Sequence, residues 1–246
     1  MRLSIITLAL ILSTNLYSQS DDIFAISDGV VVVQNDILED RRNGYMGTRS
    51  NKARRFYNKA LRKSSTDVVE AIALYLKSIE ADPFFVEAYD NVGRLYRVTK
   101  DYSSAIEYYQ KSIALFPEGQ TAHQNLALVY KSSGDDEKAA SEYQTLINLF
   151  PNNPEGYYGL ATVYLSSSDT KELMQLALEN AVKALELYSI DPPSYIGDSY
   201  FLIGYINYFL SNESEMLKYF ELAKESYLEN NLPGVWQHKE EIIKRL

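Results

Sequence analysis

Few side chains in this 246-residue sequence are of the types that do chemistry. Of its two histidines, His123 falls in a repeating aromatic position, and His238 has no acidic residue or second histidine at metal-site spacing. The acidic run Asp135-Asp136-Glu137 lies in a predicted turn before a helix, where solvation and favourable charge explain it. No phosphate-binding glycine loop, G-x-S-x-G or H-E-x-x-H motif is present. These residues predict a protein that is not an enzyme and uses no cofactor or metal.

The composition is that of a globular, acidic protein. Hydrophobic residues make up 46% and charged residues 23%, which excludes a disordered chain. The formal net charge of -9 argues against nucleic-acid binding, which requires clustered Lys and Arg. The absence of cysteine excludes disulfides, thiol catalysis and Cys-ligated zinc. The 21 tyrosines suit both a core that reaches the surface and a binding face.

The first residues predict an export signal over 1–18. Met1-Arg2 is followed by an uncharged apolar run from Leu3 to Leu12, which is too short to cross a bilayer but suits the core of a signal peptide. We expect cleavage near Ser18-Gln19 and a periplasmic, envelope-associated or secreted protein, with no membrane span after cleavage. A buried N-terminal helix and a retained, tethering signal are the alternatives.

Six sequence positions recur with a period of 34 residues. Their members are Ala71, Ala105 and Ala139; Tyr75, Tyr109 and Tyr143; Pro83, Pro117 and Pro151; Tyr96, Tyr130 and Tyr164; Gly93, Ala127 and Ala161; and Tyr89, His123 and Tyr157. Agreement of six positions over three repeats indicates an internal repeat, which decides the fold class.

These positions resemble the tetratricopeptide repeat (TPR) family, whose unit is a helix-turn-helix. The resemblance covers most of the chain from about Lys52 to Asn230 and implies an all-α helical-repeat solenoid of about five repeats with a C-terminal closing helix. The predicted organisation is 1–18 signal peptide; 19–51 partly ordered extension; 52–232 solenoid, with repeats at about 52–85, 86–119, 120–153, 154–196 and 197–230; and 233–246 capping helix.

Each recurring position has a physical reason. Gly93, in the stretch AYDNVGRLY, costs a helix roughly 0.5–1 kcal/mol relative to alanine. We expect it to be small because the second helix of the pair crosses there, with Ala105 permitting the approach and Tyr109 filling the remaining space. Pro117 ends one unit and starts the next, since proline cannot continue a helix.

Three regions depart from the pattern. The first helix of repeat one, within 51–63, loses the tyrosine and leucine positions. In repeat four the expected alanine is Ala177 where strict spacing gives Leu173, so four extra residues near 166–175 add a helical turn or lengthen a loop. Repeat five has Asn207 in the tyrosine position. Before the repeats, residues 23–40 could form a short strand or a degenerate helix, and 41–51 read as a loop.

The resemblance implies that a partner binds the concave face built by the first helix of each repeat. At the corresponding positions this chain has Asp90, Arg94, Arg97, Gln124, Lys131, Tyr158, Thr162, Phe201, Tyr205 and Tyr208. The predicted face is polar and partly basic in its N-terminal half and aromatic in its C-terminal half.

Two features of this face have competing interpretations. Asn91 and Asn125 stand where some family members clamp a partner's C-terminal carboxylate, but Glu87 and Thr121 stand where cations would be needed. Phe201, Tyr205 and Tyr208 follow three-to-four spacing and form either an aromatic groove or core covered by the closing helix.

The sequence thus predicts a non-enzymatic interaction module or scaffold in the periplasm or cell envelope, whose partner is another protein or a peptide. The alternatives are a subunit that recognises a glycan or small ligand through its tyrosines, and a homo-oligomer that stacks end to end.

Overall fold

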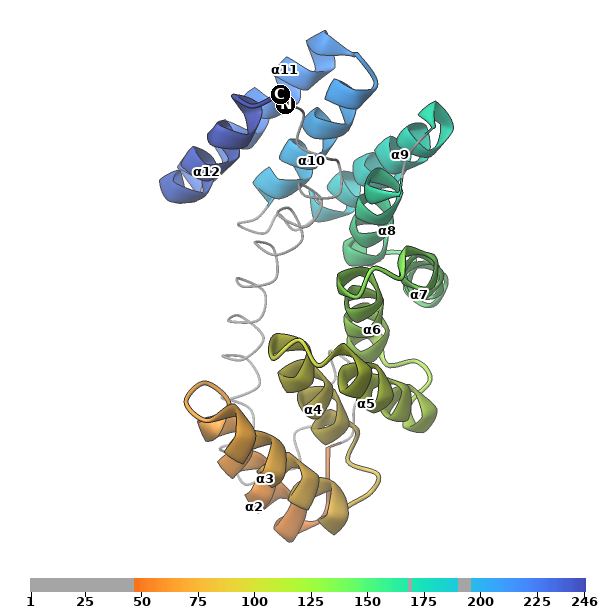
Figure 1. The fold of residues 1–246 in the computed structure, drawn as a ribbon, viewed down its shortest axis with the longest axis vertical. Coiled ribbons are helices and arrows are strands. Elements are labelled where there is room, and N and C mark those ends of the chain that lie inside the picture. The colour runs from red at the N-terminus through yellow and green to blue at the C-terminus, as the bar shows by residue number, and fades with distance from the viewer. Residues whose placement is uncertain (1–46, 168–169, 190–195) are drawn as a thin grey trace. The chain divides into compact units, whose positions relative to one another are not determined.

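The computed structural model describes residues 47–167, 170–189 and 196–246, and in these ranges it contains eleven helices and no strand (Figure 1). The helices are α2 (Asn51–Lys63), α3 (Val68–Ala81), α4 (Val86–Val98), α5 (Tyr102–Leu115), α6 (Gln120–Ser132), α7 (Asp136–Leu149), α8 (Pro154–Ser166), α9 (Lys171–Tyr188), α10 (Ile196–Phe209), α11 (Glu213–Glu229) and α12 (Pro233–Ile243). The predicted all-α helical-repeat fold is confirmed. The predicted signal peptide and residues 19–46 lie outside the described residues.

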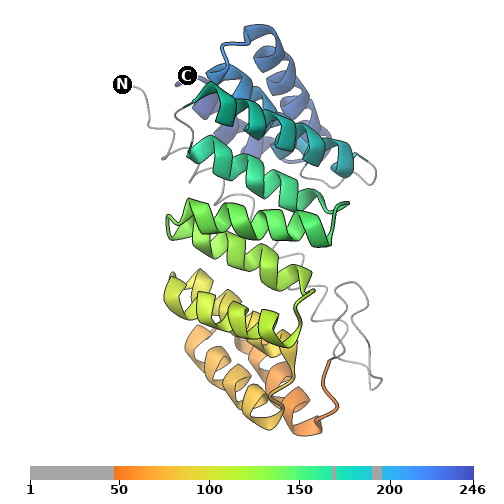
Figure 2. The ribbon, with the colours of Figure 1, turned by 90° about the vertical axis from the view of Figure 1, so that its right-hand side faces the viewer.

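The chain divides into two compact units. The N-terminal unit, described over 47–142, contains α2 to α6 and the start of α7; the C-terminal unit, Tyr143–Leu246, contains the rest of α7 and α8 to α12. In the N-terminal unit each helix packs against the next from α2 to α6 (Figure 2). Helix α4 also contacts α6. In the C-terminal unit each helix packs against the next from α8 to α12. None of the described helices has the length and hydropathy that crossing a membrane requires.

The core is built by the recurring alanines and tyrosines. Ala105 and Tyr109 in α5 are fully buried, as are Ala71 and Tyr75 in α3. The small residue at position 93 adjoins the Tyr109 ring, which confirms that a helix crossing selects it. Packing of this kind explains why the sequence repeats at these positions and varies elsewhere.

A further recurring position starts the second helix of each pair. Asp67, Asp101 and Asp135, again 34 residues apart, accept backbone N–H hydrogen bonds from the first turns of α3, α5 and α7 at 2.9, 3.2 and 3.2 Å. An N-terminal cap of this kind satisfies one of the N–H groups that a helix leaves unpaired. The acidic run at Asp135 therefore has a structural role.

Repeat one is displaced by one residue and keeps the buried positions of the pattern. Helix α2 begins 35 residues before α4, whereas α3 begins 34 before α5. The buried residues Ala53, Tyr57 and Ala60 accordingly lie 35 residues before the buried residues of α4, which are Ala88, Val92 and Leu95. The expected loss of the tyrosine and leucine positions holds in this register, where Ala60 stands for Leu95 and Leu61 for Tyr96. The buried positions themselves are kept, because one extra residue in the α2–α3 turn shifts them.

In repeat four the extra residues lengthen a helix. Helix α9 has 18 residues, whereas α5 and α7 have 14. Ala177, the seventh residue of α9, is fully buried, whereas the equivalent Ala139 is the fourth residue of α7. The insertion therefore mostly extends the helix, while the α8–α9 connection is one residue longer than the α6–α7 connection.

The turn inside a helix pair recurs in the connection to α12. Between α4 and α5, Lys100 has φ 63° and the Asp101 amide donates to the Tyr96 carbonyl at 2.9 Å. Between α11 and α12, Asn231 has φ 58° and the Leu232 amide donates to the Tyr227 carbonyl at 2.8 Å.

The connections between pairs are different. In the α5–α6 connection the Gly119 amide donates to the Phe116 carbonyl at 3.0 Å, and equivalent bonds follow the other two closing prolines. Because the α11–α12 turn has the within-pair form, α12 folds back as the second member of a hairpin with α11.

Candidate functional site

The polar residues predicted on α4 and α6 lie on neighbouring helices of the N-terminal unit. We call Asp90, Asn91, Arg94 and Arg97 of α4, together with Gln124 and Lys131 of α6, the α4/α6 polar face. Another side of α4 buries Ala88, Val92 and Leu95 in the core. Because the apolar and the polar residues of α4 each recur at helical spacing, they lie on different sides of the helix, and this places the α4/α6 polar face.

Three charged residues of the α4 part act electrostatically on the hydroxyl of Tyr109. Burial raises the pKa of Tyr109; the charges of Arg97 and Arg94 act to lower it, and the charge of Asp90 acts to raise it. Asp90 is only 6% exposed, whereas Arg94 and Arg97 are half-buried. The two arginines are therefore more accessible to solvent than Asp90.

Asn91 is fixed by its own neighbours. Its Nδ2 donates to the Tyr57 hydroxyl in α2 and to the Glu87 carbonyl, both at 2.9 Å, and its Oδ1 accepts from Arg94 Nη2 at 3.4 Å. Asn125, at the same position of the next repeat, donates to the Thr121 carbonyl at 3.0 Å. The Asn91 amide thus holds α2 against α4 and helps to orient Arg94.

The α6 part of the face adds an amide and a lysine with a perturbed pKa. Gln124 and Lys131 are both half-buried. Desolvation lowers the pKa of Lys131 to about 8, although the nearby Asp136 carboxylate acts in the opposite direction. Lys131 therefore loses its charge in a mildly alkaline range where an ordinary lysine keeps it.

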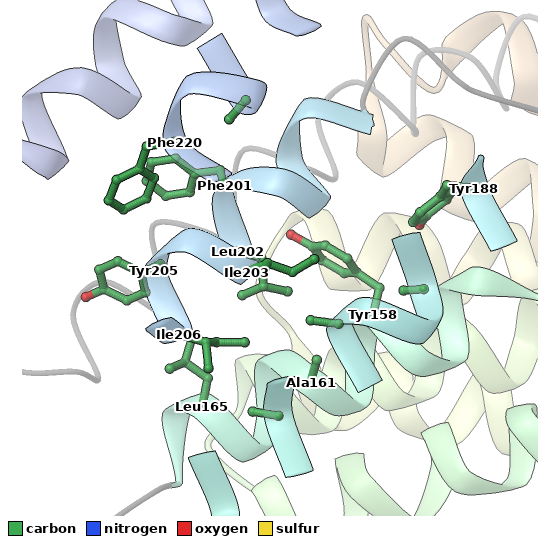
Figure 3. Close-up of a cluster of buried hydrophobic side chains, with 14 of the residues drawn as sticks. Tyr158, Ala161, Leu165, Tyr188, Phe201, Leu202, Ile203, Tyr205, Ile206 and Phe220 are labelled. Carbon is green, nitrogen blue, oxygen red and sulfur yellow. The ribbon is translucent and has the colours of Figure 1, made fainter. Parts of the chain in front are cut away.

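The residues predicted on the first helices of the C-terminal unit are mostly buried. Tyr158 and Thr162 in α8 are buried, and the Thr162 hydroxyl donates to the Gly159 carbonyl of its own helix at 2.7 Å. Phe201 and Tyr205 in α10 belong to a hydrophobic cluster (Figure 3), where Phe201 is fully buried and Tyr205 is 3% exposed.

The closing helix α12 explains the burial of the α10 aromatic residues, as the core interpretation of the sequence expected. Lys239 of α12 lies 4.7 Å from the ring centroid of Phe201. Tyr208 is half-buried, and its hydroxyl donates to the Leu246 carbonyl at 3.0 Å. For Phe201 and Tyr205 the structure supports the core interpretation, because α12 packs on this side of α10.

The sequence interpretation missed the residues that α12 contributes. Lys239 lies three residues from Trp236 and from Ile242, on the apolar side of its helix, and is 1% exposed. A lysine at helical spacing between apolar residues is the sequence signal that points to a buried cation.

The histidines have no catalytic geometry within the described ranges. His123 is buried, with Nδ1 2.9 Å from Glu142 Oε2 and Nε2 2.9 Å from the Pro117 carbonyl. His238 is exposed on α12. Among the described residues no three His, Asp or Glu side chains converge on a metal position.

Comparisons with known proteins identify the repeat. A family model described as TPR repeat matches residues 129–167, and one described as tetratricopeptide repeat matches residues 86–118. No curated protein matches this chain.

Solved structures share the fold. MamA protein is 24% identical, with a TM-score of 0.60 over 73% of this chain and 94% of its own. MamA from Desulfovibrio magneticus RS-1 is 17% identical, with a TM-score of 0.63 over 74% and 98%. YrrB, described as a TPR protein with an unusual peptide-binding site, is 20% identical, with a TM-score of 0.55 over 76% and 90%. Together with the repeat positions and the helix pairs, the two family-model matches show that the chain contains tetratricopeptide repeats, and the solved structures show that it shares their fold.

Proposed function

We propose that this chain is a non-enzymatic interaction module that binds a segment of another protein on the α4/α6 polar face. The observation that carries the proposal is the charge of this face in a chain whose formal net charge is -9. Arg94, Arg97 and Lys131 are half-buried there, while Asp90 is almost wholly buried. A basic surface on an acidic protein favours a partner segment that carries carboxylates.

The rigidity of the face supports binding without large rearrangement. Asn91 is held by Tyr57 and by its own helix, and Arg94 in turn contacts Asn91. Side chains held in this way lose little conformational entropy when a partner binds. The fold similarity to YrrB, whose description names a peptide-binding site, is consistent with a peptide as the ligand.

The location of this activity is a proposal from the sequence. The positive start at Arg2 and the apolar run to Leu12 support export, and hence a partner in the periplasm or envelope. The glycan alternative depended on an exposed aromatic face, but Phe201 and Tyr205 are buried beside α12. No observation therefore favours it over a protein partner.

The proposal is tested by capture of partners from the native envelope with three forms of the full chain. These are the parent, an Arg94→Glu/Arg97→Glu variant, and a Lys59→Glu variant that changes an exposed lysine on α2. We expect quantitative mass spectrometry to show at least one protein whose recovery falls more than about tenfold with the double variant only, since two attractive charges become repulsive. Equal recovery with all three forms would contradict the proposal.

A further inference from the structure

A buried ion pair fixes α12 to α10 in the C-terminal unit. Lys239 Nζ lies 3.0 Å from Asp198 Oδ1, and both side chains are almost completely removed from solvent. Removing a lysine and a carboxylate from water is costly, and their mutual attraction offsets that cost only when the geometry is good. An apolar contact would hold α12 in place without this cost. The ion pair therefore indicates that the surface around Asp198 is selective for a cation.

The surface that receives the lysine has further groups suited to a cation. The Tyr227 hydroxyl in α11 donates to Asp198 Oδ1 at 2.5 Å. The Phe201 ring centroid lies 4.7 Å from Lys239 Nζ, and the Tyr205 ring is nearly parallel to that of Phe201. A carboxylate beside an aromatic face attracts an ammonium group through both charge and the ring quadrupole.

Apolar side chains of α12 flank the lysine. Ile242 is buried in the cluster that contains Phe201, and Val235 and Ile243 pack against the same cluster. The Trp236 ring lies 6.5 Å from the Tyr227 ring. Helix α12 thus lies on α10 and α11 as an amphipathic helix lies on a receptor surface, with its anchors about one turn apart.

The attachment of α12 is suited to release. The helix has 11 residues, and a helix of this length is marginal when it is not packed. It is joined to α11 by only the three residues 230–232. Undocking therefore breaks the Lys239–Asp198 ion pair and the apolar contacts of α12, and it leaves the α10–α11 pair in place.

We propose that Asp198, Phe201, Tyr205 and Tyr227 form a receptor for an amphipathic helix that carries one lysine among apolar residues, and that α12 is its resident ligand. A partner helix of this chemistry displaces α12 and occupies the same surface. This site is separate from the α4/α6 polar face, and its failure in a test leaves the proposed function untouched.

The test uses a fluorescent peptide of residues 233–246 as the probe and the full chain as receptor. In the Lys239→Glu chain the new carboxylate faces Asp198 and releases α12, so the surface becomes free for the peptide. We expect the peptide to bind this variant at least tenfold more tightly than it binds the parent, as measured by fluorescence anisotropy. The matched control is Lys244→Glu, which changes the exposed lysine at the C-cap of the same helix and is expected to behave like the parent.

Two further measurements separate binding from loss of structure. A peptide with Lys239→Glu should not bind the Lys239→Glu chain, because its carboxylate meets Asp198. In the parent, hydrogen exchange of α12 amides should be at least tenfold faster than that of α10 amides. This measurement uses the parent chain alone, so it does not depend on the folding of a variant. Failure of a helical Lys239→Glu chain to bind the parent peptide, or equal exchange of α12 and α10, would overturn the proposal.

Discussion

The ring of Tyr109 in α5 lies against the backbone of Gly93 in α4 so closely that a Cβ at position 93 would come within 2.9 Å of the ring Cε1. The same relationship recurs in repeat five, where a Cβ on Gly204 would lie 2.7 Å from Phe220 Cδ1. Each contact joins the two helices of one pair. The glycine that weakens the helix locally is therefore what permits the pair to close.

The first prediction concerns this contact. Gly93→Leu should destabilise the protein by about 1–3 kcal/mol, because the Tyr109 ring is fully buried and has little room to move. Gly234→Ala is the control, since a Cβ there meets no atom within 4 Å, and it should be neutral or stabilising by up to about 1 kcal/mol. Urea unfolding measures both, and a Gly93→Leu chain as stable as the parent would refute the assigned crossing.

The second prediction concerns the pH dependence of stability at His123. Burial alone lowers the pKa of His123, but its hydrogen bonds to Glu142 and the Pro117 carbonyl, with the charges of Glu142 and Asp90, raise it overall. The group thus contributes stability that is complete below its unfolded pKa of about 6.5 and is lost as pH rises through the folded value. Urea unfolding between pH 5.5 and 9 should show this loss.

A tyrosine at this position provides the matched control. Tyr89, in the same position of the preceding repeat, donates its hydroxyl to the Pro83 carbonyl at 3.0 Å. His123→Tyr should therefore keep a donor to the Pro117 carbonyl while removing the histidine's part of the pH dependence. An unchanged pH profile in this variant would assign the dependence to other groups.

The third prediction concerns Lys131, whose pKa burial lowers to about 8. An unfolded lysine holds its proton until about pH 10.4, so the unfolded chain binds more protons than the folded chain between these values. Stability should therefore gain a contribution as pH rises from 8 towards 10.4. The gain should be absent in Lys131→Met, and equal slopes for the two chains in this window would disprove the assignment.

The fourth prediction concerns the cap of α5. Asp101→Ala removes the acceptor for the Ser104 amide and should cost about 1 kcal/mol of unfolding free energy. Asp101→Asn keeps an equally good capping oxygen and should cost little. Thermal unfolding compares the two variants, and equal losses would show that the charge, and not the cap, stabilises the helix.

The repeat itself was predictable because the same packing problem recurs in every unit. The alanine, tyrosine and small-residue positions follow from one crossing geometry, and Gly93, Ala105 and Tyr109 lie where that geometry requires. The displacement of α2 was not predictable from a strict period of 34, because one added turn residue moves Tyr57 without changing its role.

The candidate site was harder to predict, because periodicity assigns a residue to a side of its helix but does not say what covers that side. Asp90 and Phe201 are at positions expected to face a partner, yet Asp90 is 6% exposed and Phe201 lies under Lys239. The fold-back of α12 depends on a turn at Asn231 whose form is not encoded by a proline or glycine.

The central claim is that a partner binds at the α4/α6 polar face, and a photo-crosslinking residue at Gln124 tests it most directly. The control places the same group at Gln144, an exposed residue of α7 in the C-terminal unit. We predict that irradiation in the native envelope joins position 124, and not position 144, to one defined protein, and that Arg94→Glu/Arg97→Glu abolishes this product. A crosslink that forms equally from both positions, or that persists in the double variant, would contradict the claim.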